Sequence, residues 1–229
     1  MTTPPTVLLN VDAGEHDDEP EALYTLAHAL NIACGGHAGD DASMERVLRA
    51  CLHHGARAGA HPSYPDRASF GRVSMPIEPA ALARSVREQC ARLAVIAARV
   101  GVPLAHAKLH GALYHDANRD PALAAATLTA VVEALGAVIV VGPPEGQLRQ
   151  FCAREGLRYE REGFADRALR SDGTLVPRTE PGALITDPSR AAAQALALAG
   201  SGHDTICVHA DTAGALEIAR TVRAALDVR

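Results

Sequence analysis

The feature of this sequence that most limits its fold is a repeated alternation between short apolar runs and longer amphipathic segments, with polar, glycine-containing turns between them. Such runs are typical of buried parallel strands, and the amphipathic segments have the periodicity of the helices that connect such strands. Strands are predicted at residues 6–11, 30–33, 56–60, 104–108, 138–141, 157–160, 183–185 and 205–208. Helices are predicted at residues 41–54, 79–100, 121–135, 146–155, 188–199 and 212–226. The sequence therefore predicts repeated βα units around a parallel sheet.

This number of strands, alternating with helices, favours a (β/α) barrel, distorted or short of a strand, over an open sheet. An open dinucleotide-binding sheet would carry a glycine-rich fingerprint after its first strand, and none follows residues 6–11. The 229 residues contain no linker, repeat or low-complexity tract, so we expect a single catalytic domain over residues 1–229. Only 3% of the residues are aromatic and none is Trp, which predicts a core of Ala, Leu, Val and Ile.

Charge and cysteine content narrow the classes of partner. The formal net charge is -5, and no run of Lys or Arg provides the positive surface that nucleic acid or an anionic membrane would require. The five cysteines are widely spaced, without a C-x-x-C pair, and are predicted to be buried thiols rather than disulfides or zinc ligands. No signal-like or membrane-length apolar segment occurs, so we expect a cytoplasmic protein whose partner is a small molecule or another protein.

Two carboxylates follow the first predicted strand. Asp12 and Glu15 flank Gly14, which permits a sharp turn. Because the catalytic residues of a barrel lie at the C-terminal ends of its strands, this pair can bind a cation or divide the acid and base roles. The alternative is that one of the two carboxylates caps the helix expected near Glu19.

Histidines recur at the same position after later strands. His37 and Asp40 belong to a glycine-rich segment after the second strand, and His61 follows the third. Lys108 ends the fourth strand, where burial without a partner is costly, and His110 follows it. Each feature taken alone has a simpler explanation: a plain turn for the glycine-rich segment, a stiff loop around His61, and a solvent-exposed side chain for Lys108. A parallel barrel, however, brings these strand ends together, which favours one shared catalytic pocket.

Six ordered motifs resemble the LamB/YcsF family, the A components of 5-oxoprolinases. The motifs are NVDAGE, NIACGGHAGD, GAHPSYPD followed by FGR, KLHGALY, FADRAL and TICVHADT, and the resemblance covers residues 8–226. It implies a barrel of the glycoside hydrolase/deacetylase type that hydrolyses 5-oxo-L-proline (pyroglutamate), a lactam, to L-glutamate. It also implies ATP with Mg²⁺ as cofactor, and 5-oxoprolinase subunits B and C as partners.

The strand-end positions and the resemblance together select the site residues. The predicted catalytic residues are Asp12, Glu15, His61, Lys108 and His110. The predicted substrate- or nucleotide-binding residues are Asn10, Asn31, Gly35, His37, Asp40, Tyr114, Asp166, Arg167, His209 and Asp211. We expect Lys108 to neutralise phosphate charge, and Asp12 and Glu15 to hold Mg²⁺ or act as the base. His61 or His110 would transfer protons.

Two other functions stay open. A metal-dependent hydrolase or deacetylase, working on an amide or lactam without ATP, would use Asp12, His61 and His110 as ligands of one divalent ion. A non-catalytic subunit would instead hold a small acid for partner proteins. The segment after Glu15 is shorter here than in the family, and this difference supports the second alternative.

Overall fold

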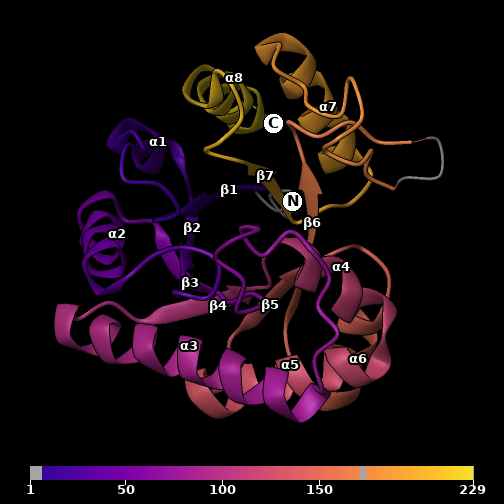
Figure 1. The fold of residues 1–229 in the computed structure, drawn as a ribbon. Coiled ribbons are helices and arrows are strands. Elements are labelled where there is room, and N and C mark those ends of the chain that lie inside the picture. Colours follow the sequence, from indigo (N-terminus) through magenta and orange to yellow (C-terminus); the bar gives the residue numbers. More distant parts are fainter. Residues whose placement is uncertain (1–6, 171–173, 229) are drawn as a thin grey trace.

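The structure, a computed structural model, describes residues 7–170 and 174–228. Within them, parallel strands form a closed seven-strand barrel in sequence order, and β7 pairs with β1 to close it (Figure 1). The strands are β1 (Leu8–Ala13), β2 (Ala29–Ala33), β3 (Arg57–His61), β4 (Leu104–Lys108), β5 (Ile139–Gly142), β6 (Tyr159–Phe164) and β7 (Thr205–Val208). The helices are α1 (Glu21–Leu26), α2 (Asp41–His54), α3 (Pro79–Val100), α4 (Gly111–Arg119), α5 (Pro121–Leu135), α6 (Gln147–Glu155), α7 (Pro188–Gly200) and α8 (Ala215–Asp227).

The barrel contains one strand fewer than the sequence predicts. Residues 183–185 provide only an isolated antiparallel bridge between Leu184 and Arg167, and β6 pairs directly with β7. Ala183 and Ile185 are nevertheless buried, and their backbone groups bond to the loop after β6. This apolar run directly after Gly182 is too short to form a ladder, so it packs against that loop instead. The prediction of a distorted barrel is thus confirmed, and the prediction of an eighth strand at residues 183–185 is wrong.

Two other differences from the predicted elements lie at the C-terminal ends of strands. β6 begins later than predicted and extends to Phe164, so that Glu162 lies within the strand. The sequence does not predict α4, which begins immediately after His110. Residue 6, the predicted start of the first strand, lies outside the described residues.

The apolar core lies between the strands and the surrounding helices. It is built mainly from Ala, Leu, Val and Ile, as predicted, and all five cysteines are buried and free. None of the described helices is long and apolar enough to cross a membrane. Alternate residues of each strand face into the barrel, and there Asn10, Asn31 and His106 are buried and hydrogen-bonded to one another across the strands. Gly59 makes room for one of them, since a Cβ there would overlap the imidazole of His106.

Candidate active site

Lys108 forms the buried centre of the site. Its Nζ lies 2.8 Å from Asp12 Oδ1, 2.9 Å from Glu162 Oε1 and 3.2 Å from Cys207 Sγ. Both carboxylates and the lysine are at most 3% exposed. Burial alone would lower the pKa of Lys108, but the neighbouring acidic groups, Asp12 first and Glu162 among them, together outweigh it and raise that pKa well above its ordinary value. Lys108 is the only lysine in the sequence, and it is held as a cation between two acids.

Asp12 is kept ionised by its neighbours. Burial would raise its pKa, but His61 and Lys108 together hold that pKa well below its usual range. The His61 Nε2 atom lies 3.4 Å from Asp12 Oδ2, the oxygen that faces away from Lys108. Burial would lower the pKa of His61, and the nearby Asp12 carboxylate raises it above 6.5 instead. Asp12 and His61 therefore form an acid–histidine pair.

Two predicted binding residues support Asp12 from inside the barrel. Asn31 Nδ2 donates to Asp12 Oδ1 and to Asn10 Oδ1, at 2.8 Å each. The Asn31 Oδ1 atom lies 2.8 Å from Nε2 of His106, whose pKa burial lowers to about 3. A neutral His106 donates this hydrogen bond. Asn10 and Asn31 are buried below the strand ends, so the structure gives them a positioning role toward Asp12.

Three side chains gather around His61 at the end of β3: Glu15 from the loop after β1, His37 from the loop after β2, and His110 from the residue before α4. Glu15 Oε1 lies 2.8 Å from His37 Nε2, 3.2 Å from His110 Nδ1 and 3.8 Å from His61 Nε2. The His61 Nε2 and His110 Nδ1 atoms are 3.0 Å apart. Burial lowers the pKa values of His37 and His110, that of His37 to about 3. The structure thus brings together Glu15 and three predicted histidines.

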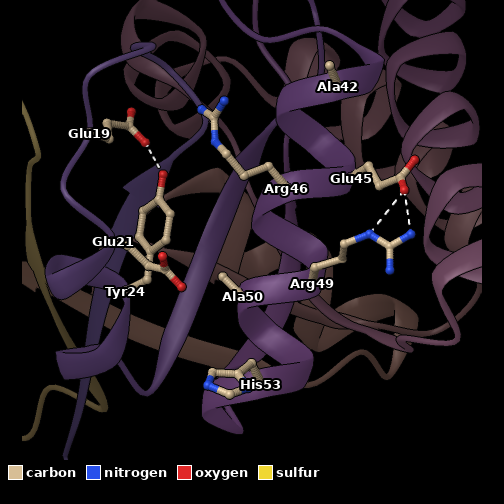
Figure 2. Close-up of a pocket in the computed structure, with 9 residues that line it drawn as sticks. All are labelled: Glu19, Glu21, Tyr24, Ala42, Glu45, Arg46, Arg49, Ala50 and His53. Carbon is tan, nitrogen blue, oxygen red and sulfur yellow. Dashed lines mark hydrogen bonds and ion pairs between the residues drawn. The ribbon is translucent and has the colours of Figure 1, made fainter.

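Glu19 holds the turn that carries Glu15. Its carboxylate accepts hydrogen bonds from the backbone N–H groups of Gly14, Glu15 and His16, at 2.7, 2.8 and 2.9 Å. The Tyr24 hydroxyl donates to the same carboxylate, in the wall of a groove of about 630 Å³ between α1 and α2 (Figure 2). Glu19 is therefore a positioning residue for Glu15. Sequence reasoning does not assign it, because a carboxylate just before a helix usually signals only a favourable helix start.

The capping alternative for the first two carboxylates does not apply. The N-cap of α1 is Pro20, and the contacts of Asp12 and Glu15 are those of the site. By contrast, Asp40 is exposed and caps α2, accepting a hydrogen bond from the Ser43 N–H at 2.8 Å.

The loop after β3 closes one side of the histidine cluster. The Phe70 carbonyl oxygen lies 3.0 Å from His110 Nε2, and the Phe70 ring packs edge-on against His37 and His110. Gly71 must be small here, because a Cβ would come within 2.9 Å of the His37 Cβ. Arg72 extends from this loop to Asp211, with Nη2 2.5 Å from Oδ2. The sequence motif FGR marks this loop, but the predicted site omits it.

Asp166 and His209 join the ends of β6 and β7. Asp166 accepts hydrogen bonds from the His209 backbone N–H (3.0 Å) and the Thr212 hydroxyl (2.6 Å), and its Oδ1 lies 2.9 Å from His209 Nδ1. Burial would raise the pKa of Asp166, but the interaction with His209 and these hydrogen bonds lower it below 3.8. The other ring nitrogen of His209 lies 4.0 Å from Asp12 Oδ2. Asp166 therefore orients His209 toward Asp12.

Two arginines pair with Asp211, and a third, Arg167, lies near enough for its charge to act on the same region. Arg72 and Arg178 both pair with the Asp211 carboxylate, the second at 2.9 Å. Arg167 is 8% exposed; one of its Nη atoms donates to the Val176 carbonyl oxygen, and its Nε has no partner among the described residues. Burial and the charge of Arg178 lower the pKa of Arg167 to about 10. This part of the site therefore has more positive than negative charge.

Two predicted binding residues remain: Gly35 contributes a backbone hydrogen bond, and Tyr114 packs against a neighbouring aromatic ring. The Gly35 N–H donates to the Ala38 carbonyl oxygen at 2.8 Å, within the turn that carries His37. Tyr114 is buried, and its ring packs edge-on against Phe164.

A closed parallel barrel with a buried lysine, carboxylates and histidines at the C-terminal ends of its strands has the architecture of a barrel enzyme with an acid–base centre. Comparison with known proteins is more specific. The model of the LamB/YcsF family matches residues 7–229, so the chain belongs to that family.

Two solved structures are informative. A lactam utilization protein from Thermus thermophilus is 35% identical, with a TM-score of 0.88, over 97% of this chain and 96% of that one. A family 4 carbohydrate esterase from Streptomyces lividans, in complex with acetate, is 11% identical with a TM-score of 0.53, over 98% of this chain and 88% of that one. The second likeness concerns the fold alone and agrees with the predicted barrel type.

Proposed function

We propose that this protein hydrolyses 5-oxo-L-proline to L-glutamate as the A component of an ATP-dependent 5-oxoprolinase, together with subunits B and C. Membership of the LamB/YcsF family and the similarity to a lactam utilization protein support a lactam as substrate. The observation that carries the proposal is the buried Asp12–His61 pair, placed between Lys108 and Glu15 at the strand ends.

The chemistry of lactam opening suits these groups. Water must lose a proton as it adds to the carbonyl carbon, and the ring nitrogen must gain one as the C–N bond breaks. Asp12 and His61 lie in hydrogen-bonding range of one another and can hold that proton between the two steps. Lys108 places positive charge beside the negative charge that develops on oxygen. ATP with Mg²⁺, if bound, would supply the energy of the reaction, and Lys108 would neutralise charge on its phosphates.

The arginines around Asp211 fit the anionic part of the substrates. Arg72 and Arg178 pair with Asp211, and Arg167 keeps a buried Nε without a partner among the described residues. Arginine binds carboxylates and phosphates through paired N–H groups. We assign to this cluster the carboxylate of 5-oxoproline or a phosphate of ATP.

The direct test measures glutamate released from 5-oxoproline by the protein mixed with subunits B and C, with and without ATP. We expect release only in the complete mixture with ATP. Exchanging Asp12 for Asn should lower the rate by at least about 100-fold, because the pair with His61 loses its base. The matched control is Asp41→Asn, an exposed aspartate on α2, which should keep the rate. An Asp12→Asn variant with normal activity would refute the role of Asp12.

The Glu15–histidine cluster supports a second candidate, a metal-dependent amide hydrolase that works without ATP. Release of glutamate by the protein alone, without ATP, would favour it. Binding of 5-oxoproline without release, even with both partner subunits and ATP present, would instead indicate a binding subunit.

A further inference from the structure

We propose that Glu15, His61 and His110 bind one divalent transition-metal ion of the Zn²⁺ type. This inference does not require that the substrate be a lactam. It differs from the ligand set predicted from the sequence, because Glu15 takes the place of Asp12.

The first argument is the direction of the ring nitrogens. His61 Nδ1 lies 2.8 Å from the Lys108 carbonyl oxygen, which accepts a hydrogen bond and so fixes the proton on Nδ1. The Phe70 carbonyl oxygen fixes the proton of His110 on Nε2 in the same way, at 3.0 Å. In the neutral rings, the lone pairs of His61 Nε2 and His110 Nδ1 then face each other across 3.0 Å, with the Glu15 oxygen beside them. Three electron-rich atoms at this separation are stabilised by a positive charge between them, either a metal ion or a proton on His61 Nε2, and the test below distinguishes the two.

The second argument is the spacing of these atoms. Zn–N and Zn–O bonds of roughly 2.0–2.1 Å in a tetrahedral site place neighbouring ligand atoms about 3.3 Å apart. The three separations here are 3.0, 3.2 and 3.8 Å, on both sides of that value. The His61 and His110 rings are also perpendicular. Ligating histidines commonly donate their other N–H to a backbone carbonyl, as both do here.

His37 belongs to the surroundings of the site rather than to the ligands. Its ring is stacked on that of His110, with centroids 3.5 Å apart and planes within 1°. Lone pairs in two parallel planes cannot point at one ion, so both rings cannot ligate it together. His37 Nε2 lies 2.8 Å from Glu15 Oε1 and can donate its proton there. His37 therefore orients the carboxylate ligand.

A second group of donor atoms close by is already neutralised. Asp12, Cys207 and His209 also lie within range of one another. The Lys108 ammonium, however, contacts Asp12 Oδ1 and Cys207 Sγ at 2.8 and 3.2 Å, so that it fills the place of a cation. This is why Asp12 is left out of the ligand set.

The donor set indicates the kind of ion and its use. Two imidazoles and one carboxylate favour Zn²⁺, Co²⁺ or Mn²⁺ over Mg²⁺ and Ca²⁺, which prefer all-oxygen sites. Three protein ligands leave a position for water or for a carbonyl oxygen, as in catalytic zinc sites. Asp12 Oδ2, 3.4 Å from His61 Nε2, lies close enough to accept a proton from such a water. With the ion bound to His61 Nε2, the base is therefore Asp12 alone rather than the Asp12–His61 pair.

The test is equilibrium dialysis of the metal-stripped full chain against buffered Zn²⁺ at pH 8. We expect one tightly bound Zn²⁺ per wild-type chain, and affinity at least about 100-fold weaker in His61→Asn and in His110→Asn. In His37→Gln we expect one ion still bound, about 10- to 100-fold more weakly. Co²⁺ in place of Zn²⁺ should give a visible absorption band in wild type that both ligand variants lose.

The matched control is His53→Asn. His53 lies on α2, in the lining of the groove in Figure 2, and its ring contacts that of His54. This surface pair is the obvious place for adventitious binding, so the control should leave the tight site unchanged. Circular dichroism shows whether each variant folds, and Glu15→Gln, which keeps the side-chain shape, tests the site again if a histidine variant does not.

Three results would overturn the site: no Zn²⁺ on the wild type, unchanged binding in both ligand variants, or loss of binding in His53→Asn. The first would mean that a proton on His61, rather than a metal, separates the two rings. Tight Zn²⁺ binding without glutamate release would leave the metal site standing and reject only the proposed substrate.

Discussion

The two ends of the barrel both carry charged side chains in the interior, but they use them differently. At the N-terminal end, Arg57 of β3 donates two hydrogen bonds to the Glu160 carboxylate of β6, at 2.9 and 2.7 Å. This pair is partly exposed, with 29% and 14% of the two side chains accessible. At the C-terminal end, Lys108 lies between Asp12 and Glu162, all almost fully buried.

The two ends differ in which polar and charged groups they leave without a hydrogen-bond or ion-pair partner. The Arg57–Glu160 pair is a bidentate contact that reaches across the barrel, and among the described residues it leaves only Arg57 Nε without a partner. At the opposite end, the charges of Lys108 and Asp12 adjoin histidine lone pairs that face one another. A group that is buried without a complete set of partners costs stability, and such groups persist where a ligand completes them. The comparison separates a structural end of the barrel from a chemical one.

The largest effect is expected from Lys108→Met. Removing the ammonium leaves Asp12 and Glu162 buried without their cation, so the free energy of unfolding should fall by about 3–5 kcal/mol. Urea unfolding at pH 7 measures it. The control is Arg149→Met, which breaks an exposed pair with Glu145 and should cost less than about 1 kcal/mol. If the two variants lost equal stability, the contrast between buried and exposed charge would fail.

A smaller effect, dependent on pH, is expected from Asp166→Asn. The folded protein lowers the pKa of Asp166, so the ionised carboxylate adds stability above about pH 4, and this contribution disappears as the pH falls through the folded-state pKa. The variant should therefore be about 1–3 kcal/mol less stable than wild type at pH 7. The gap should narrow below pH 4. Denaturant unfolding at several pH values measures the gap; one that widened in acid would contradict the assigned direction.

The smallest effect is expected from Glu160→Gln at the N-terminal end. The pair with Arg57 is partly exposed, so its loss should cost about 1 kcal/mol or less, and the difference should shrink in high salt. Zn²⁺ affinity and glutamate release should match wild type. A change in either one, in a variant that is fully folded, would show that this end of the barrel also contributes to the site.

Much of the fold follows from local pattern. Three amphipathic segments form helices with the predicted ends: Asp41–His54, Pro79–Val100 and Pro121–Leu135. The signals act locally: helix periodicity and a following Gly in all three, and a first-turn Pro in the last two. The strand-end rule also selects Asp12, Glu15, His61, Lys108 and His110, and the structure brings these five together.

Other site residues depend on contacts between segments far apart in the chain. Glu162 carries the same signal as Lys108, a charge near the end of a strand, but the sequence predicts an earlier end for that strand than the structure shows. The role of Glu19 is set by the turn that its carboxylate holds, and that of Phe70 by a backbone carbonyl. No side-chain pattern encodes a carbonyl contact.

The sequence by itself therefore determined the parallel barrel and which side chains stand at its active end, since both depend on the order of apolar and polar residues along the chain. Only the tertiary structure decided that the barrel closes with seven strands, that Lys108 pairs with Asp12 and Glu162, and that Glu15 faces His61 and His110. The physical reason is distance: pairing of charges and lone pairs depends on separations of a few ångströms between residues far apart in the chain.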